Sequence, residues 1–185
     1  CYTYRMHPMS SVIARSQLGH LDDWNDMRRQ NAEYLSEKLS EIPGVAPPTV
    51  ADGGRHVYHI YPMTYEADQM DGLSREAYLK ALEAEGVTVN TYVKEPIYLR
   101  NRYQEQEYFW GQGLPWSLGK REVKYSKGDC PVAEKRCAEQ EMNVGSTGWY
   151  EDCTELMDQY AAAFRKVAEN VGHLKEREAE LGEAN

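Results

Sequence analysis

The chain has 185 residues, which is enough for one domain with a sizeable core, or for one domain with a packed helical arm. Hydrophobic residues make up 41% of it and charged residues 28%, a globular mixture that argues against disorder. The 21 Lys+Arg against 30 Asp+Glu give a net charge of −9, and the sequence contains no basic run. The chain is therefore a poor candidate for binding nucleic acid or an anionic membrane.

Residues 10–42 are predicted to form one long helix. Apolar side chains recur near the helical period along this stretch, Ser10 or Ser11 can cap its start, and the Pro43-Gly44 pair ends it. At about 1.5 Å per residue the helix would be close to 50 Å long, more than a small domain needs. This length favours a connection between two bodies of structure, while a surface helix on a single domain fits the same pattern.

The next segment alternates strands with a helix. The stretch 56–65 is rich in β-forming residues and is predicted to be a strand, with an edge position or a bulge at Pro62, which cannot donate to a ladder. Ser74 is expected to cap a short helix over 75–85, and a second strand is expected over 87–93.

Residues 99–129 show no clear period and are predicted to be irregular, which in a compact domain usually marks a functional or mobile segment. A helix from Pro131 to about Gln140, a short strand near 141–145 and a strong helix over 150–170 follow. The charged tail has little to bury and is expected to fray. This order of elements predicts an α/β fold in which helices cover a small sheet.

Neither metal nor membrane binding is indicated. The four cysteines, at positions 1, 130, 137 and 153, match no zinc-type spacing and are expected to be reduced thiols. Phosphate-loop, dinucleotide-binding and hydrolase motifs are missing, and neither a signal peptide nor a membrane-length apolar run is present. We therefore expect a cytoplasmic protein.

The N-terminal segment holds the best candidate for binding an anion. Arg5 offers a planar guanidinium that can bind a carboxylate or a phosphate through two hydrogen bonds. In an extended segment Tyr2 and Tyr4 would lie on one side of the backbone and Thr3 on the other. An ordinary salt bridge between Arg5 and an acidic residue explains the same arginine, so these residues alone do not reveal the function.

Several blocks in a fixed order carry a family resemblance. They are YRMHPM, IARSQLGHLDDWNDMRRQNAEYLSEKLSEIPGV, HVYHIYPMTY, GLSREAYLKALEAEGV, CPVAEKRCAEQ and AAAFRKVAEN. Together they resemble the C-terminal portion of the DegT-type aminotransferases. These are fold-type I enzymes that depend on pyridoxal phosphate (PLP) and aminate keto-sugars or aminocyclitol precursors. RMHP, followed by a long segment before CPVAE, is closer to the members that act on cyclitols.

The resemblance implies a division of the chain. Residues 1–9 would be an active-site segment left from the large PLP-binding domain, and residues 10–44 a long connecting helix. Residues 45–172 would form the small C-terminal α/β domain, with a mostly antiparallel sheet, and residues 173–185 the charged tail. The Schiff-base lysine would lie upstream of Cys1, so no catalytic residue is expected here and this chain should not bind PLP covalently.

The resemblance also implies binding residues. In the family homodimer, the segment before RM reaches the partner's active site, and many members carry an Asn two residues before the Arg. Here that position is Thr3, so Thr3 and Arg5 are the expected contacts to the cofactor phosphate, although Arg5 could instead bind the amino donor's carboxylate. A threonine hydroxyl can donate one hydrogen bond, but the departure puts a direct equivalence in doubt.

The substrate side is expected to involve Tyr2 and Tyr4 as wall residues. Tyr98 stands near a position where many members have a substrate-side histidine. His59 and the segment 103–125 are further expectations for the substrate rim.

As a whole, the resemblance predicts part of an enzyme that transfers an amino group from glutamate or glutamine to a keto-sugar or keto-cyclitol. The missing large domain and a second subunit would be its partners. A free-standing α/β binding module without catalytic activity is the alternative. If the large domain is missing, the helix at 10–42 should expose apolar side chains and the chain should self-associate.

Overall fold

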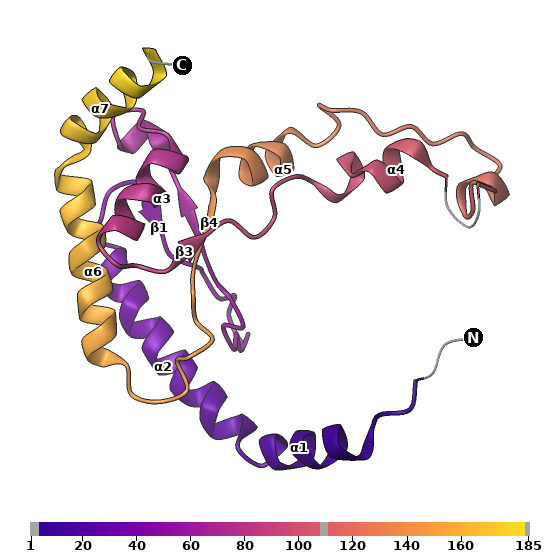
Figure 1. Ribbon diagram of the computed structural model, residues 1–185, viewed down its shortest axis with the longest axis horizontal. Helices are drawn as coiled ribbons and strands as arrows, with labels where there is room; N and C mark the ends of the chain where they lie inside the picture. Colours follow the sequence, from indigo (N-terminus) through magenta and orange to yellow (C-terminus); the bar gives the residue numbers. More distant parts are fainter. Residues whose placement is uncertain (1–3, 108–110, 184–185) are drawn as a thin grey trace.

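Residues 4–107 and 111–183 are described by the computed structural model, whose elements are shown in Figure 1. The helices are α1 (Pro8–Leu18), α2 (Leu21–Leu39), α3 (Arg75–Ala84), α4 (Asn101–Glu105), α5 (Pro131–Lys135), α6 (Thr154–Glu169) and α7 (Val171–Glu183). The strands are β1 (Val45–Ala46), β2 (Tyr61–Tyr65), β3 (Val89–Asn90) and β4 (Glu141–Val144).

The four strands form one antiparallel sheet in the order β1-β2-β4-β3. Along β2 the side chains of Tyr61, Met63 and Tyr65 are buried, as expected for a strand with one face toward a core. The Tyr65 ring stacks on Tyr78 of α3 with centroids 4.8 Å apart, and the Tyr61 hydroxyl lies 2.7 Å from the Ser36 hydroxyl of α2. Helices therefore cover this face, and the predicted fold class is confirmed.

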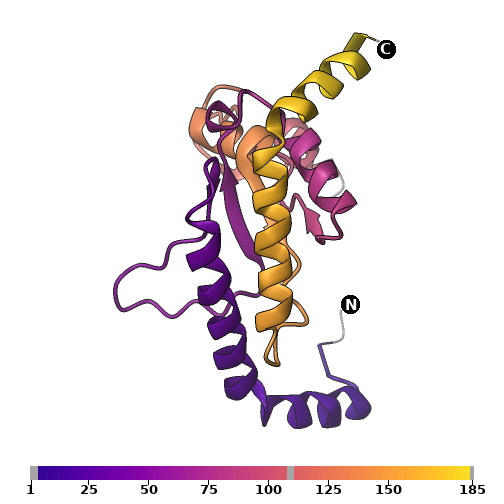
Figure 2. The same ribbon diagram turned by 90° about the vertical axis from the view of Figure 1, so that its left-hand side faces the viewer.

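Helices α2 and α6 lie side by side along the sheet, and both views show them in contact over most of their length (Figures 1 and 2). Their buried side chains include Leu35 and Leu39 from α2 and Met157 and Phe164 from α6. Phe164 also meets Tyr78 edge to face at 6.2 Å. These large apolar side chains, spaced four residues apart in α2 and seven in α6, join the helices to the sheet in one core.

The predicted strand over 56–65 is too long. Only residues 61–65 pair, because Tyr58 has a left-handed backbone (φ 47°), which the ladder cannot accommodate. The prediction of an edge strand is also wrong, since β2 lies between β1 and β4. Pro62 is tolerated there because β1 pairs only with Tyr65 and Thr64, so no β1 residue faces the proline. The strand expected over 87–93 shortens to β3.

The prediction of one helix over 10–42 is wrong. The helix stops at Leu18 and resumes at Leu21, and Figure 1 shows α1 turned away from the axis of α2. Gly19 sits at the break with its N–H bonded to the Ser16 carbonyl at 3.2 Å. Glycine disfavours a helix interior by roughly 1 kcal/mol, and α1 buries no residue that would hold the two axes in line.

Helix α1 exposes the apolar side chains that the sequence predicted. Met9, Val12 and Ile13 are 66%, 67% and 60% exposed. An apolar surface exposed to this extent usually marks a contact with another domain or protein.

The prediction that the charged tail frays is also wrong for the residues described. Helix α7 runs to Glu183 because it is tied to α3 and the turn before it. Lys175 Nζ donates to the Gly72 carbonyl at 2.5 Å, and the Ser74 N–H donates to Glu178 at 3.4 Å.

Residues 94–107 and 111–129, which we call the arm, leave the sheet after β3 and project from the body before the chain returns to α5 (Figure 1). The arm contains α4 and 3-10 turns at Ile97–Leu99 and Trp116–Leu118, in agreement with the predicted irregular segment. After it, α5 continues as a π-helical turn over Arg136–Gln140. The prediction of a helix ending near Gln140 is therefore confirmed.

Candidate functional site

The N-terminal segment presents Arg5 to solvent. Tyr4 is 92% exposed and Arg5 is exposed, while the predicted residues Tyr2 and Thr3 lie outside the described residues. Within the part of the chain that the structure describes, Arg5 forms no salt bridge, so the alternative of an ordinary internal ion pair finds no support. His7 then begins α1 by accepting the Met9 N–H at Nδ1, 3.2 Å away.

His59 lies in the segment between β1 and β2 that Figure 2 shows reaching away from the body. Its side chain is exposed and its carbonyl accepts the Ser146 hydroxyl at 3.2 Å. His56 has a structural task instead, because its Nδ1 accepts the Tyr58 N–H at 2.9 Å and its ring lies 4.3 Å from that of Tyr58. The local fold therefore leaves the His59 imidazole available for a ligand.

Tyr98 closes the base of the arm. Its hydroxyl donates a short hydrogen bond to Glu134 of α5, and the same carboxylate accepts the Gly128 N–H at 2.6 Å. Desolvation, together with this hydrogen bond to Glu134, raises the pKa of Tyr98 to about 12. The hydrogen bond from Tyr98 holds the pKa of Glu134 below its usual value. The predicted substrate residue thus has its hydroxyl committed to a contact within the chain.

We expect Tyr98 to ionise near pH 12 rather than near its ordinary 10.0. Because the folded pKa is raised, the stabilisation from the neutral phenol is complete below the unfolded value and is lost as pH rises through the folded value. Glu134→Gln should shift the Tyr98 pKa back toward 10.0, since the anionic acceptor is removed.

Tyrosine ¹³Cζ shifts followed by NMR, with the signal assigned through Tyr98→Phe, measure this pKa. An unchanged Tyr98 pKa in Glu134→Gln would show that the carboxylate does not hold the phenol.

A second polar cluster joins the start of β4 to the π-helical turn. Arg75 is only 8% exposed, and its Nη1 donates to the carbonyls of Cys137 at 3.0 Å and Glu141 at 3.2 Å. Its Nη2 binds Glu76 at 2.7 Å. Asn143, paired across the sheet with Pro62, is 2% exposed and its Oδ1 has no partner. The Arg75 contacts therefore join the start of α3 to the π-helical turn and to the first residue of β4.

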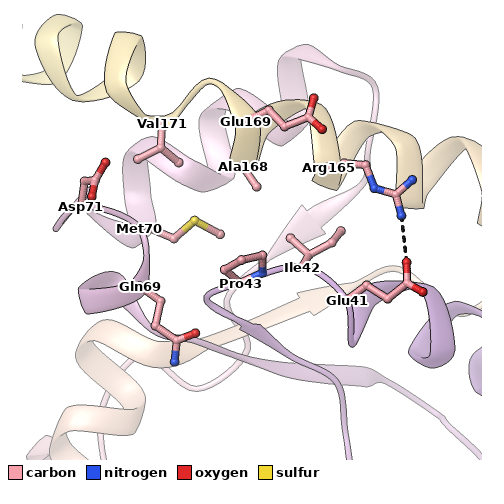
Figure 3. Close-up of a pocket in the computed structure, with 10 residues that line it drawn as sticks. All are labelled: Glu41, Ile42, Pro43, Gln69, Met70, Asp71, Arg165, Ala168, Glu169 and Val171. Atoms are coloured by element: carbon pink, nitrogen blue, oxygen red, sulfur yellow. Dashed lines mark hydrogen bonds and ion pairs between the residues drawn. The ribbon is translucent and has the colours of Figure 1, made fainter.

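A hollow of about 340 Å³ lies where α2 ends and α6 meets α7 (Figure 3). Ile42, Pro43 and Met70 form an apolar floor, and Figure 3 shows Arg165 turned toward Glu41 at the rim. Arg165 is the only basic side chain among its described lining residues, and it is paired with Glu41 at 3.2 Å. None of the predicted site residues lines this hollow.

The described residues do not fit a covalent PLP site. A Schiff-base lysine lies in an enclosed pocket, whereas every lysine of this chain is at least partly exposed. In residues 4–107 and 111–183, no group of three His, Cys, Asp or Glu side chains could hold a metal ion. Over the same residues, no helix combines the length and apolar character needed to cross a membrane.

The structure does not bring the predicted site residues together. Among the residues described, no hydrogen bond or ring contact joins Arg5, His59 and Tyr98. Helix α1 lies below the body in Figure 1, and the arm projects from the upper part of the body.

Sequence reasoning missed three polar residues that organise the structure. Asn31 is 4% exposed and ties α2 to the loop before α6, Arg75 ties α3 to β4, and Glu134 ties the arm to α5. Asn31 carries a usable signal, because it lies four residues before Leu35 on the apolar side of the helix. The partners of Arg75 and Glu134 are distant in sequence, so no local pattern shows them.

The model of the DegT/DnrJ/EryC1/StrS aminotransferase family matches residues 1–117. The spore coat polysaccharide biosynthesis protein SpsC of Bacillus subtilis is 29% identical over 108 residues, 57% of this chain and 27% of that protein. The dTDP-3-amino-3,4,6-trideoxy-alpha-D-glucose transaminase of Streptomyces venezuelae is 32% identical over 100 residues, 54% of this chain and 24% of that protein. The matched part is thus about a quarter of the length of these relatives.

Solved structures share the fold. S. venezuelae DesV, in complex with a ketimine intermediate, superposes with a TM-score of 0.67 at 23% identity, over 89% of this chain and 37% of that chain. 3-Amino-5-hydroxybenzoic acid synthase gives a TM-score of 0.59 at 19% identity, over 86% of this chain and 37% of that chain. Because the family model covers well over half of the residues, this chain belongs to the DegT/DnrJ/EryC1/StrS aminotransferase family.

Proposed function

We propose that this chain is the C-terminal part of a PLP-dependent aminotransferase and works with a large PLP-binding domain. Family membership is the observation that carries the proposal, and the exposed apolar side chains of α1 support it. In this proposal the large domain packs against Met9, Val12 and Ile13, and covering them removes apolar surface from water. The proposed division is an active-site segment over 1–9, a connector over 10–44 and a small domain over 45–172.

PLP, when bound, would supply the electron sink for amino transfer. This chain's own residues would bind and orient. Arg5, and Thr3 through its hydroxyl, would hold the phosphate of a cofactor seated in a partner subunit, with Tyr2 and Tyr4 beside them as walls. A homodimer in which each N-terminal segment serves the other subunit is part of the proposal.

The proposed substrate is a keto-sugar or keto-cyclitol, and the proposed donor is glutamate or glutamine. The S. venezuelae relative is a dTDP-3-amino-3,4,6-trideoxy-alpha-D-glucose transaminase, which supports a sugar-like substrate. His59 would meet the substrate through its exposed imidazole. Tyr98 would do so through its ring, because its hydroxyl already donates to Glu134.

Fusion of this chain to the large domain of the S. venezuelae transaminase, in place of the region it matches, tests the proposal. We expect the fusion to bind PLP and to convert it to the aminated form when glutamate or glutamine is added, followed by absorbance. A folded fusion that binds PLP but accepts no amino group from either donor would contradict the enzyme and favour the non-catalytic binding module.

Arg5→Ala in this fusion should weaken PLP binding by roughly ten- to hundredfold, because a charge-assisted hydrogen bond to phosphate contributes about 1.5–3 kcal/mol. Arg15→Ala is the matched control, since Arg15 is an exposed arginine of α1 outside the active-site segment. Equal PLP affinity in the two variants, measured by fluorescence titration, would remove Arg5 from the cofactor site.

A further inference from the structure

We propose that the arm is an exchanged contact between two copies of this chain, in which the outer end of each arm binds an acidic surface on the other copy. This inference rests on the dimer that we propose above and names the surfaces that form it. It depends on three features of the arm, which are its internal bracing, its exposed outer end and its charge.

The arm is braced by its own side chains. The Tyr103 ring meets Trp116 edge to face at 5.9 Å and Tyr125 at 5.7 Å, and Trp116 Nε1 donates to the Tyr125 hydroxyl at 3.1 Å. Gln106 Nε2 donates across the arm to the Val123 carbonyl at 2.8 Å. Aromatic pairs of this kind stabilise the outer part of the arm, in addition to the contact of its base with Glu134 of α5.

The outer end of the arm carries an apolar side chain and two cations. Leu118 ends the 3-10 turn Trp116–Leu118 and is 78% exposed, and the exposed Lys120 and Arg121 follow it after Gly119. Among the described residues, neither Lys120 nor Arg121 forms a salt bridge, although their neighbour Lys124 pairs with Glu122 at 3.1 Å. We call Leu118, Lys120 and Arg121 the tip.

Charge separates the arm from the rest of the chain. Residues 94–129 contain seven Lys+Arg and five Asp+Glu, a net charge of +2. The whole chain carries −9, so subtracting +2 leaves −11 on the other residues. A cationic arm on an anionic body is complementary to a second copy of the same chain, and two exchanged arms close a two-fold dimer.

The acidic surface lies where α2 begins beside the loop before α6. Asp22 and Asp23 occupy the first turn of α2, and Glu151 follows Tyr150, whose ring lies 5.8 Å from that of Trp24. In the described part of the chain these three carboxylates form no salt bridge. Leu21 and Tyr150 are each 44% exposed among them, so the surface offers both apolar area and negative charge to the tip.

Analytical ultracentrifugation of the 185-residue chain tests the exchange. At about 0.01 M salt, where the Debye length is ~30 Å, we expect a species near twice 21.3 kDa, and at about 1 M salt, where it is ~3 Å, dissociation to the single chain. Association through the apolar face of α1 has the opposite signature, because salt does not weaken it, and Val12→Glu would abolish it. That outcome would overturn the arm contact while leaving the proposed function intact.

Charge reversal locates the contact. The pair Lys120→Glu with Arg121→Glu, and separately the pair Asp22→Lys with Asp23→Lys, should each weaken the low-salt dimer at least about tenfold. Combining all four changes should restore association, which a folding defect would not do. Lys80→Glu, on the exposed side of α3, is the control and should leave the dimer unchanged. No weakening in the tip variant, or no recovery in the combined variant, would overturn the proposal.

Discussion

Asn31→Ala is expected to lower the free energy of unfolding by about 3 kcal/mol. The Asn31 side chain is 4% exposed and serves three backbone groups of the loop before α6. Its Nδ2 donates to the carbonyls of Trp149 at 3.2 Å and Glu151 at 2.7 Å, and its Oδ1 accepts the Cys153 N–H at 3.1 Å. Each hydrogen bond contributes about 1 kcal/mol, and the substitution also leaves largely buried backbone groups without partners.

Urea unfolding followed by circular dichroism measures the change, with Gln30→Ala as control because Gln30 is the exposed neighbour on the same helix. We expect the control to remain within about 0.5 kcal/mol of the unchanged protein. A loss in Asn31→Ala no larger than in the control would mean that the loop is held by other contacts.

Trp149→Ala is expected to cost about 3–5 kcal/mol, the range for removing a large aromatic side chain from a core. Trp149 is 2% exposed and its ring centroid lies 5.4 Å from that of Tyr61, the first residue of β2. The substitution leaves a cavity between the sheet and the loop that Asn31 holds.

Trp116→Ala removes the same side chain from the arm and is the matched comparison. We expect a loss of less than about 1 kcal/mol in the global unfolding transition, because Trp116 contacts Tyr103 and Tyr125 of the arm rather than the core. Equal losses in the two tryptophan variants would contradict the separation of arm and core described above.

The sequence correctly predicted the helices and strands whose ends depend on residues close by in the chain. Ser74 was expected to cap the helix over 75–85, and its hydroxyl accepts the Ala77 N–H at 3.1 Å at the start of α3. Gly86 follows with φ 90°, a conformation that glycine adopts without the cost a side chain would add. The four-residue strand near 141–145 is likewise found as β4.

Predictions failed where tertiary contacts decide. The apolar period continues through Gly19, so it gave no sign that the first turns would lack anything to pack against. The charged composition of α7 gave no indication that Lys175 donates a hydrogen bond to the carbonyl of Gly72, which lies 103 residues earlier in the chain. In the same way no local pattern indicated that the Tyr98 hydroxyl donates to Glu134, 36 residues on, and its contact with a substrate stays a prediction.

The sequence indicated which residues could form the candidate site, but not how these residues are arranged in space. Arg5 was singled out by its chemistry, and the structure adds that it is exposed and, in the described residues, outside any ion pair. The sequence could not place Arg5 relative to His59 or Tyr98, because no local pattern sets the relative positions of segments so far apart in the chain.

Covalent labelling tests the proposal that the lysine that binds PLP belongs to the large domain and not to this chain. We would load the fusion described above with PLP, reduce it with borohydride and map the labelled peptide by mass spectrometry. A single label on a lysine of the large domain, with none in these 185 residues, is the predicted result. A stoichiometric label on any lysine of this chain would contradict the proposal that it only covers and orients the substrate and cofactor.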